Sequence, residues 1–278
     1  MKFWEAWDSY EKDRQLLNYS PVTLKSYKIQ CKLLVDALGD PEIEDVTRDQ
    51  LRNYLSQQVH LKPQSLEHRI KFIRAFFRWA TDEGICIKNP AVTIHFPKTG
   101  MRIPKFLHEE NIEDLREACI TRLERAIFEF LYTTGCRIGE AALVDVKDIN
   151  WEKQSLVVHG KGSREREIYF SSTCKIWLKK YIQDRKDNDP ALFVTERAPH
   201  RMSIAQMRYI LKRITKRSGI DVNVYPHRLR HSYATHLLNN GAPMEAIQQL
   251  LGHSKQETTQ VYAQMTGELR RQIYNKYF

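Results

Sequence analysis

The chain has 278 residues, which is long enough for two ordinary domains with separate hydrophobic cores. A hydrophobic content of 42% and a charged content of 28% are typical of a globular protein. No apolar run approaches the roughly 18 residues of a membrane span, and the amphipathic, acidic start differs from an export signal. The sequence therefore predicts a cytoplasmic, nucleoid-associated protein, and its net charge of +10 predicts nucleic acid as the partner.

The cysteines and acidic residues give no sign of a bound metal or cofactor. Five cysteines are widely separated, and none belongs to a CxxC or Cys/His ligand pattern: Cys31, Cys86, Cys119, Cys136 and Cys174. Reduced thiols are the expected state. The chain also lacks a P-loop, an HExxH sequence and an obvious acidic metal cluster, so we expect no cofactor and no metal.

Residues 1–88 show the periodicity of four helices and are interpreted as an N-terminal DNA-binding domain. In the second helix, Ser20 and Pro21 provide an N-cap and first turn, and Gly39 provides a stop. Apolar residues recur between them at helical spacing and predict a core face. The fourth helix, from about Ser65 to Asp82, repeats this design.

Two rows of cations follow other faces of these helices. The rows are Lys25, Lys28 and Lys32 in the second helix, and Lys71, Arg74 and Arg78 in the fourth. A solvated surface is the plain interpretation of either row. Two matching rows in a basic protein favour contacts with DNA phosphates.

Residues 89–105 contain three prolines and a glycine without periodicity, and they are interpreted as a linker. The C-terminal domain, 106–278, is expected to begin with helices near 108–119 and 121–134. Alternating apolar residues in SLVVHGKGSREREIYF then predict a hairpin with GKGS at its tip. At least four helical segments follow, with Arg208 and Lys212 as further candidates for DNA contact. The fold is therefore predicted to be mainly α with a small β-sheet.

Six residues in four local strings of the C-terminal domain together describe a phosphoryl-transfer site. The strings are TTGCRIGE around Arg137, GKGSRER around Lys161, HRLRHSYATHLL around His227 and Arg230, and LGHSKQETTQVYAQ with His253 and Tyr262. Each has a plain alternative when taken alone, such as a turn, a helix salt bridge or a surface tyrosine. Their combination favours a shared function.

Transfer of a phosphodiester concentrates negative charge on the non-bridging oxygens, which fixed positive charge stabilises. Arg137 and Arg230 suit this role, because a guanidinium can donate two parallel hydrogen bonds to one phosphate. Tyr262 is the candidate nucleophile. Its hydroxyl, with an ordinary pKa of about 10, needs a base, and His227 is the candidate. Pro226 predicts a helix start that places His227 and Arg230 on the same side.

The remaining candidates assist this chemistry. Lys161, at the glycine-flanked hairpin tip, is the candidate general acid for the leaving oxygen. His253 is expected to donate a hydrogen bond to the phosphate, and Glu140 to orient an arginine or a histidine. His231 and His236 fit the helix pattern and are expected to be structural.

These motifs resemble those of the tyrosine recombinase (phage integrase) family, in particular its Xer-like site-specific recombinases. The similarity covers most of the chain, although Gln264 stands where many members carry histidine. It implies a two-domain clamp around double-stranded DNA with an inverted-repeat core site. It also implies a 3′-phosphotyrosyl intermediate at Tyr262, a Holliday junction, and a homotetramer on two duplexes or a heterotetramer with a related recombinase. By the same resemblance, a C-terminal tail helix after Tyr262 docks on a neighbouring protomer.

Two other functions share parts of this pattern. A type IB topoisomerase uses similar chemistry to relax supercoils, and a DNA-binding accessory protein can keep the fold without the chemistry. The compact N-terminal region and short tail disfavour the first, and the complete set of six residues disfavours the second. Chromosome-dimer resolution, transposon or plasmid resolution, and integration or excision are all consistent with the sequence.

Overall fold

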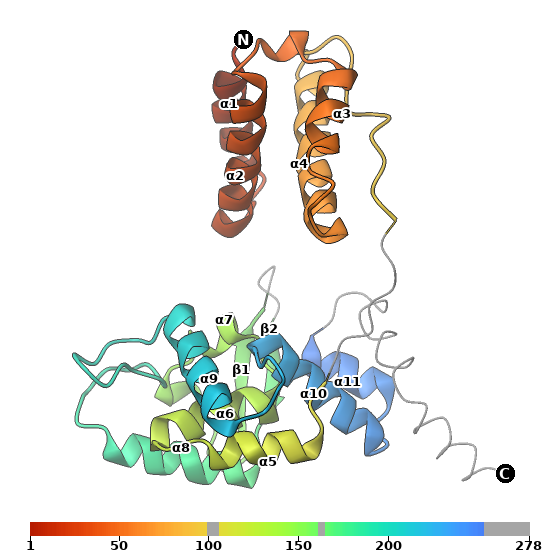
Figure 1. Ribbon diagram of the computed structural model, residues 1–278. Helices are drawn as coiled ribbons and strands as arrows, with labels where there is room; N and C mark the ends of the chain where they lie inside the picture. The colour runs from red at the N-terminus through yellow and green to blue at the C-terminus, as the bar shows by residue number, and fades with distance from the viewer. Residues whose placement is uncertain (99–105, 161–164, 253–278) are drawn as a thin grey trace, which may run out of the picture. The chain divides into compact units, whose positions relative to one another are not determined.

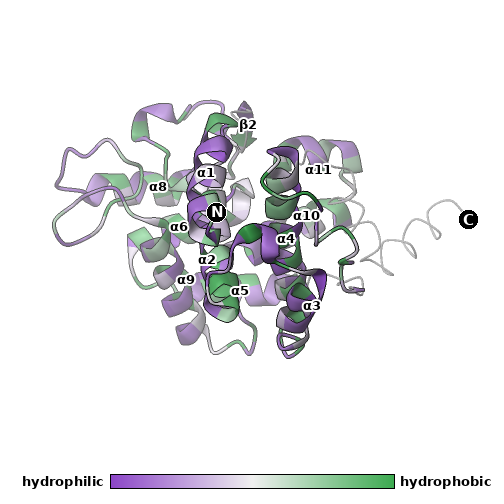
Figure 2. Cartoon of the chain, turned by 90° about the horizontal axis from the view of Figure 1, so that it is seen from above, coloured by the Kyte–Doolittle hydropathy of each residue, from purple (hydrophilic) through white to green (hydrophobic). Residues whose placement is uncertain are grey.

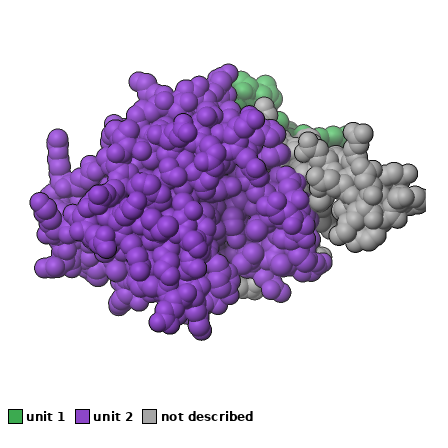
Figure 3. Space-filling view, turned by 90° about the horizontal axis from the view of Figure 1, so that it is seen from below, with its two compact units in different colours: residues 1–101 green, residues 102–278 purple. Residues whose placement is uncertain are grey.

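The computed structural model describes residues 1–98, 106–160 and 165–252 (Figure 1). The chain divides into two compact units, Met1–Met101 and Arg102–Phe278, which are coloured separately in Figure 3. None of the helices in the described ranges is long and apolar enough to cross a membrane.

In residues 1–98, the described part of unit 1, there are four α-helices and one short 3-10 helix. They are α1 (Phe3–Leu16), α2 (Pro21–Leu38), η1 (Ile43–Asp45), α3 (Arg48–Ser56) and α4 (Pro63–Asp82). The expected ends of α2 are confirmed: the Ser20 side chain accepts a hydrogen bond from the Thr23 N–H, and Gly39 takes a left-handed conformation with φ of 79°.

Aromatic side chains fill the core of unit 1. Phe3 of α1 stacks on Phe76 of α4 with ring centroids 4.7 Å apart, and Tyr10 meets Trp79 edge to face at 5.2 Å. Each such pair contributes about 0.5–1.5 kcal/mol beyond its buried area. Ala91 and Ile94 are also buried in this core. Unit 1 therefore extends past residue 88, because apolar residues of the aperiodic segment pack on the helices.

Unit 2 is helical around one hairpin. Its elements are α5 (Glu109–Glu117), α6 (Arg122–Thr134), α7 (Ile138–Ala141), η2 (Val146–Asp148), β1 (Ser155–His159), β2 (Glu165–Tyr169), α8 (Ser172–Asp184), α9 (Ile204–Ser218), α10 (Pro226–Asn239) and α11 (Met244–Leu251). The strands are antiparallel, with Ser155 opposite Tyr169 and His159 opposite Glu165. The expected fold, mainly α with a small sheet, is confirmed.

Helix α6 forms the centre of unit 2 and packs against α8, α9 and α10. Most of its side chains are buried, including Phe128 and Phe130. Helix α9 is two-sided instead: hydrophobic and hydrophilic residues alternate along it (Figure 2), and its buried residues recur at helical spacing. Burial of these apolar faces holds the helices that carry the candidate site residues.

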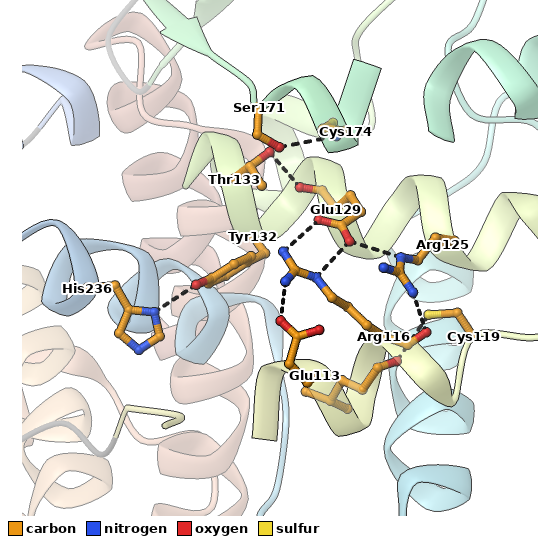
Figure 4. A network of polar contacts seen from close by, with 11 residues as sticks. Glu113, Arg116, Cys119, Arg125, Glu129, Tyr132, Thr133, Ser171, Cys174 and His236 are labelled. Carbon is orange, nitrogen blue, oxygen red and sulfur yellow. Dashed lines mark hydrogen bonds and ion pairs between the residues drawn. The ribbon is translucent and has the colours of Figure 1, made fainter. Parts of the chain in front are cut away.

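A polar network fastens α10 to α6 and to the start of unit 2 (Figure 4). The Tyr132 hydroxyl lies 2.7 Å from Nδ1 of His236, and Nε2 of His236 lies 2.9 Å from the Leu107 carbonyl oxygen. Nearby, the fully buried carboxylate of Glu129 accepts hydrogen bonds from Arg116 and Arg125. The structural role expected for His236 agrees with these contacts, because both ring nitrogens are used within the fold.

Candidate active site at the end of helix α11

The described residues include Arg137, His227, Arg230 and Glu140 of the expected site. Arg137 is the N-cap of α7, and His227 and Arg230 lie in the first turns of α10. Lys161, His253 and Tyr262 lie outside the described residues, as does the expected tail helix.

Arg137 follows a tight turn at the end of α6. Gly135 there has a φ of +57°, and the Cys136 N–H donates to the Thr134 hydroxyl at 3.2 Å. A Cβ at Gly135 would lie 2.4 Å from Cδ1 of Tyr233 on α10. Glycine is therefore required twice, for the left-handed conformation and for the close approach of α10.

The two expected phosphate-binding arginines converge on neighbouring carbonyl groups. Arg137 donates from Nη2 to the Gly252 carbonyl oxygen at 3.4 Å, and Arg230 donates from Nη2 to that of Leu251 at 2.5 Å. Arg230 also donates from Nη1 to the Gly135 carbonyl oxygen at 2.7 Å. Residues 93 positions apart thus place their guanidinium groups at one end of α11, immediately before His253.

This end of α11 attracts cations for a general reason. The last carbonyl groups of a helix have no partner within it, and the helix dipole is negative there. The arginines supply the missing donors. Arg230 is only 4% exposed, whereas the Arg137 side chain remains 34% exposed.

The Glu140 carboxylate contacts two arginines, Arg137 and Arg166. Its carboxylate accepts from the backbone N–H and from Nη1 of Arg137, both at 2.8 Å, and from both Nη atoms of Arg166 at 2.9 and 2.6 Å. Burial by itself would raise the pKa of Glu140, but the hydrogen bonds from Arg166 and Arg137 outweigh it and lower the pKa to about 2. The carboxylate is therefore ionised at neutral pH.

Sequence reasoning assigned no role to Arg166, although it lies in the GKGSRER string. A signal was present in the strand alternation: Arg166 pairs with the buried Val158 and shares a face with the buried Ile168. A charged residue on an inward face requires a buried partner.

His227 reaches the surface, yet its environment disfavours the charged form. Desolvation of its packed side, followed by the positive charges of Arg230, Arg137 and Arg208, lowers its pKa below the ordinary 6.5. His227 is thus neutral at pH 7 and able to accept a proton. The effect of Arg208 also shows that the start of α9 lies near the site.

The other candidates for DNA contact lie on three helices. Lys25, Lys28 and Lys32 are exposed on α2, Lys71 and Arg78 on α4, and Arg208 and Lys212 on α9. Arg74 differs, because its guanidinium packs over the Phe96 ring at 5.1 Å and donates to the Ile94 carbonyl oxygen. A cavity of about 690 Å³ in unit 1 is lined by Arg74 and Arg78 together with Arg14, which the sequence analysis did not single out.

Some of these cations already have acidic neighbours. Lys28 lies 3.6 Å from Glu11, and Lys71 lies 2.6 Å from Glu67. Exposed pairs of this kind contribute about 0–1 kcal/mol, so a phosphate can replace the carboxylate at little cost. In the ranges that the structure describes, no group of His, Cys, Asp or Glu is arranged to hold a metal ion.

Comparison with known proteins defines the class to which this fold and site belong. The model of the phage integrase family matches residues 105–268, and that of the phage integrase N-terminal SAM-like domain matches residues 10–84. The chain belongs to the phage integrase family, as the motifs predicted, and its enzymatic class is that of the tyrosine site-specific recombinases.

Within this family the chain is similar to the Xer proteins. It is 34% identical over 277 residues to the tyrosine recombinase XerC of Oceanobacillus iheyensis, covering 93% of this chain and 90% of the relative. The match to the crystal structure of XerA recombinase covers 99% of this chain and 98% of the XerA chain. The sequence identity is 25% and the TM-score is 0.58. The match to the structure of a lambda integrase tetramer bound to a Holliday junction covers 92% of this chain and 78% of the integrase chain. The sequence identity is 21% and the TM-score is 0.77. These similarities favour a recombinase over a topoisomerase or an accessory protein.

Proposed function

We propose that the chain cuts and rejoins double-stranded DNA at an inverted-repeat site through an ester between Tyr262 and a 3′-phosphate. The convergence of Arg137 and Arg230 at the end of α11 carries this proposal. Their side chains come from separate elements and meet beside the residues that lead into the His253–Tyr262 segment. A phosphate oxygen accepts hydrogen bonds from N–H donors, as do the carbonyl oxygens that these guanidinium groups contact.

In the first step, the Tyr262 oxygen attacks phosphorus and the bond to the 5′-oxygen breaks. His227 takes the phenolic proton, and Lys161 gives a proton to the leaving 5′-oxygen. Arg137, Arg230 and His253 donate hydrogen bonds to the non-bridging oxygens. In the second step, a 5′-hydroxyl of the partner duplex attacks the ester and releases Tyr262 with the proton transfers reversed. Ester exchange conserves the bond energy, so the balanced reaction includes no nucleotide.

Exchange of strands between two duplexes requires several protomers. The lambda integrase tetramer on a Holliday junction, which shares the fold, supports a tetramer for this chain, made of identical copies or shared with a related recombinase. In this proposal the two units clamp the DNA, and the segment that joins them begins beyond Ile94, because Ala91 and Ile94 pack in the core of unit 1. The C-terminal helix of each protomer docks on its neighbour. An Xer-like role, or resolution of transposon or plasmid intermediates, is the proposed biological setting.

Covalent trapping tests the proposal. Fragments of host genomic DNA carrying random nicks are incubated with the full chain, denatured with detergent, and the protein-bound DNA is sequenced. The wild-type chain is expected to enrich one inverted-repeat sequence. Tyr262→Phe should yield no adduct while retaining its affinity for that sequence in a gel-shift assay. An adduct with the phenylalanine variant would show that another residue is the nucleophile.

A sulfur substitution tests the acid separately. A 5′-bridging phosphorothiolate has a thiol leaving group, whose pKa of about 8.5 removes the need for a general acid. Lys161→Ala should cleave the normal duplex slowly and the sulfur duplex at nearly the wild-type rate. Equal defects on both substrates would exclude Lys161 as the acid.

A further inference from the structure

Arg166 uses all of its guanidinium nitrogens inside the protein. Nη1 and Nη2 donate to the two carboxylate oxygens of Glu140 at 2.9 and 2.6 Å, and Nε donates to the Leu250 carbonyl oxygen at 3.1 Å. The Arg166 side chain is 11% exposed and that of Glu140 is 4% exposed. Each guanidinium nitrogen of Arg166 therefore has a protein partner, and its side chain is less exposed than that of Arg137.

The geometry depends on arginine itself. The two Nη atoms form a planar fork that matches a carboxylate, and Nε points to a third acceptor at a fixed angle. A lysine ammonium at this position keeps the charge but cannot hold a carboxylate in two places and a carbonyl in a third. Arg166 thus fixes the relative positions of the Glu140 carboxylate and the Leu250 carbonyl group, in addition to neutralising the charge of Glu140.

Through Glu140, this link extends to Arg137. One carboxylate receives the fork of Arg166 and the Nη1 donor of Arg137, so the two guanidinium groups are held by a common anion. Without Arg166, the buried carboxylate would keep Arg137 as its remaining cation. Arg137 would then be drawn toward Glu140 and away from a bound phosphate.

Through Leu250, the link extends to α11. Three successive carbonyl groups at the end of this helix accept from three arginines: Leu250 from Arg166, Leu251 from Arg230 and Gly252 from Arg137. The packing is close, because a Cβ at Gly252, whose φ is +64°, would lie 2.8 Å from Cδ of Arg166. His253 is the next residue in the sequence, and Lys161 precedes Arg166 by five positions.

We propose that Arg166 is a positioning residue that fastens the end of α11 and the Arg137 side chain to the base of the hairpin. This inference rests on the proposed function, because its purpose is to fix the entry to the His253–Tyr262 segment relative to the phosphate-binding arginines. Arg166 itself does not touch the DNA phosphate. It fixes groups that do.

The test compares Arg166→Met and Arg166→Lys with Arg201→Met in the full chain. Arg201 is a matched control, because it also bonds one carboxylate, that of Asp145, and two carbonyl oxygens, those of Ala142 and Val144, without an observed bond to α11. The substrate is a nicked duplex with the sequence recovered by trapping on the wild-type chain. Single-turnover cleavage is measured at saturating protein, with rate constant and amplitude recorded separately.

Displacement of about 1 Å in a reacting group costs about 10²-fold in rate. Arg166→Met is therefore expected to lower the rate constant about 10²-fold at an unchanged DNA dissociation constant, and Arg166→Lys to restore only part of it. Simple destabilisation would instead lower the amplitude, as expected for Arg201→Met. A rate constant within twofold of wild type in Arg166→Met, or full rescue by lysine, would overturn the proposal.

Hydrogen exchange on the DNA-free chain separates this inference from the proposed function. Arg166→Met should increase amide exchange in the 244–252 peptide more than Arg201→Met does, whether or not the chain forms a covalent adduct. If the wild-type chain traps no DNA but Arg166→Met increases exchange in this peptide, the proposed function fails, whereas the link between Arg166 and the end of α11 is supported. If exchange in this peptide is unchanged, the link to α11 is wrong.

Discussion

Neighbouring cations favour the neutral form of His227, which is the form that can accept a proton. Its pKa is lowered by desolvation and by the charges of Arg230, Arg137 and Arg208, so the neutral form dominates above the ordinary value of 6.5. The cleavage rate should be flat from about pH 6.5 to 8 and should fall at lower pH as the imidazole becomes protonated.

Arg208→Met should move this acid limb to higher pH, because a charge that opposes protonation of His227 is lost. Single-turnover rates at saturating protein across the pH range provide the measurement. Lys212→Met, one turn further along α9, is the control and should leave the limb in place. An unchanged limb in Arg208→Met would argue against His227 as the titrating base.

The lowered pKa of Glu140 predicts how the unfolding free energy depends on pH in the acidic range. Its folded-state pKa is about 2 and its ordinary value is 4.5, so its stabilising effect is present above pH 4.5 and is lost as the pH falls toward 2. Between pH 6 and pH 3 this corresponds to about 2 kcal/mol of unfolding free energy, from about 1.4 kcal/mol per pKa unit.

Urea unfolding of unit 2 at the two pH values should therefore show a decline about 2 kcal/mol smaller in Glu140→Gln than in the wild type. Glu113→Gln removes a surface carboxylate and serves as the control. An equal decline in wild type and Glu140→Gln would mean that the buried carboxylate does not titrate as described.

At the scale of elements, the junction of α6 with α10 depends on the absence of a side chain at Gly135. Alanine there would meet the Tyr233 ring at 2.4 Å in a left-handed conformation. The two costs together predict a loss of about 2–4 kcal/mol of unfolding free energy. The Arg230 contact with the Gly135 carbonyl oxygen would shift as well.

Gly139 supplies the comparison, because it lies within α7 and its nearest neighbour to an added Cβ is Ile204 at an ordinary 3.7 Å. Gly139→Ala should be neutral or stabilising by up to about 1 kcal/mol. Thermal and urea unfolding of both variants measure the difference. Similar stability in the two alanine variants would show that α10 moves freely away from α6.

For the whole molecule, the net charge of +10 predicts DNA binding that weakens steeply with salt through release of counterions. If Lys71 and Arg78 of α4 contact phosphates, the double variant Lys71→Ala/Arg78→Ala should reduce the slope of log affinity against log salt by about 1.5–2. Lys2→Ala/Arg48→Ala removes two exposed cations outside both rows and should leave the slope unchanged. Equal slopes for both variants would place the α4 row away from DNA.

The local features of this protein were predictable from its sequence. The caps of α2 at Ser20 and Gly39, the start of α10 at Pro226 and the hairpin between residues 155 and 170 were all expected, and the structure has them. Each depends on residues within a few positions of one another, so periodicity and capping chemistry are enough to find them. The motif strings likewise predicted the family whose model matches the chain.

The arrangement of the site depends on contacts that no local pattern contains. Burial of α6 between α8, α9 and α10 brings Arg137 and Arg230 to consecutive carbonyl groups of α11. It also gives Glu140 two arginine partners, of which only Arg137 is near it in the sequence. The contacts of Arg166 became visible only in the tertiary structure, because its partners Glu140 and Leu250 lie 26 and 84 positions away in the sequence. Sequence determined which groups are available, and tertiary packing decided which of them meet, because helix packing joins side chains irrespective of their separation along the chain.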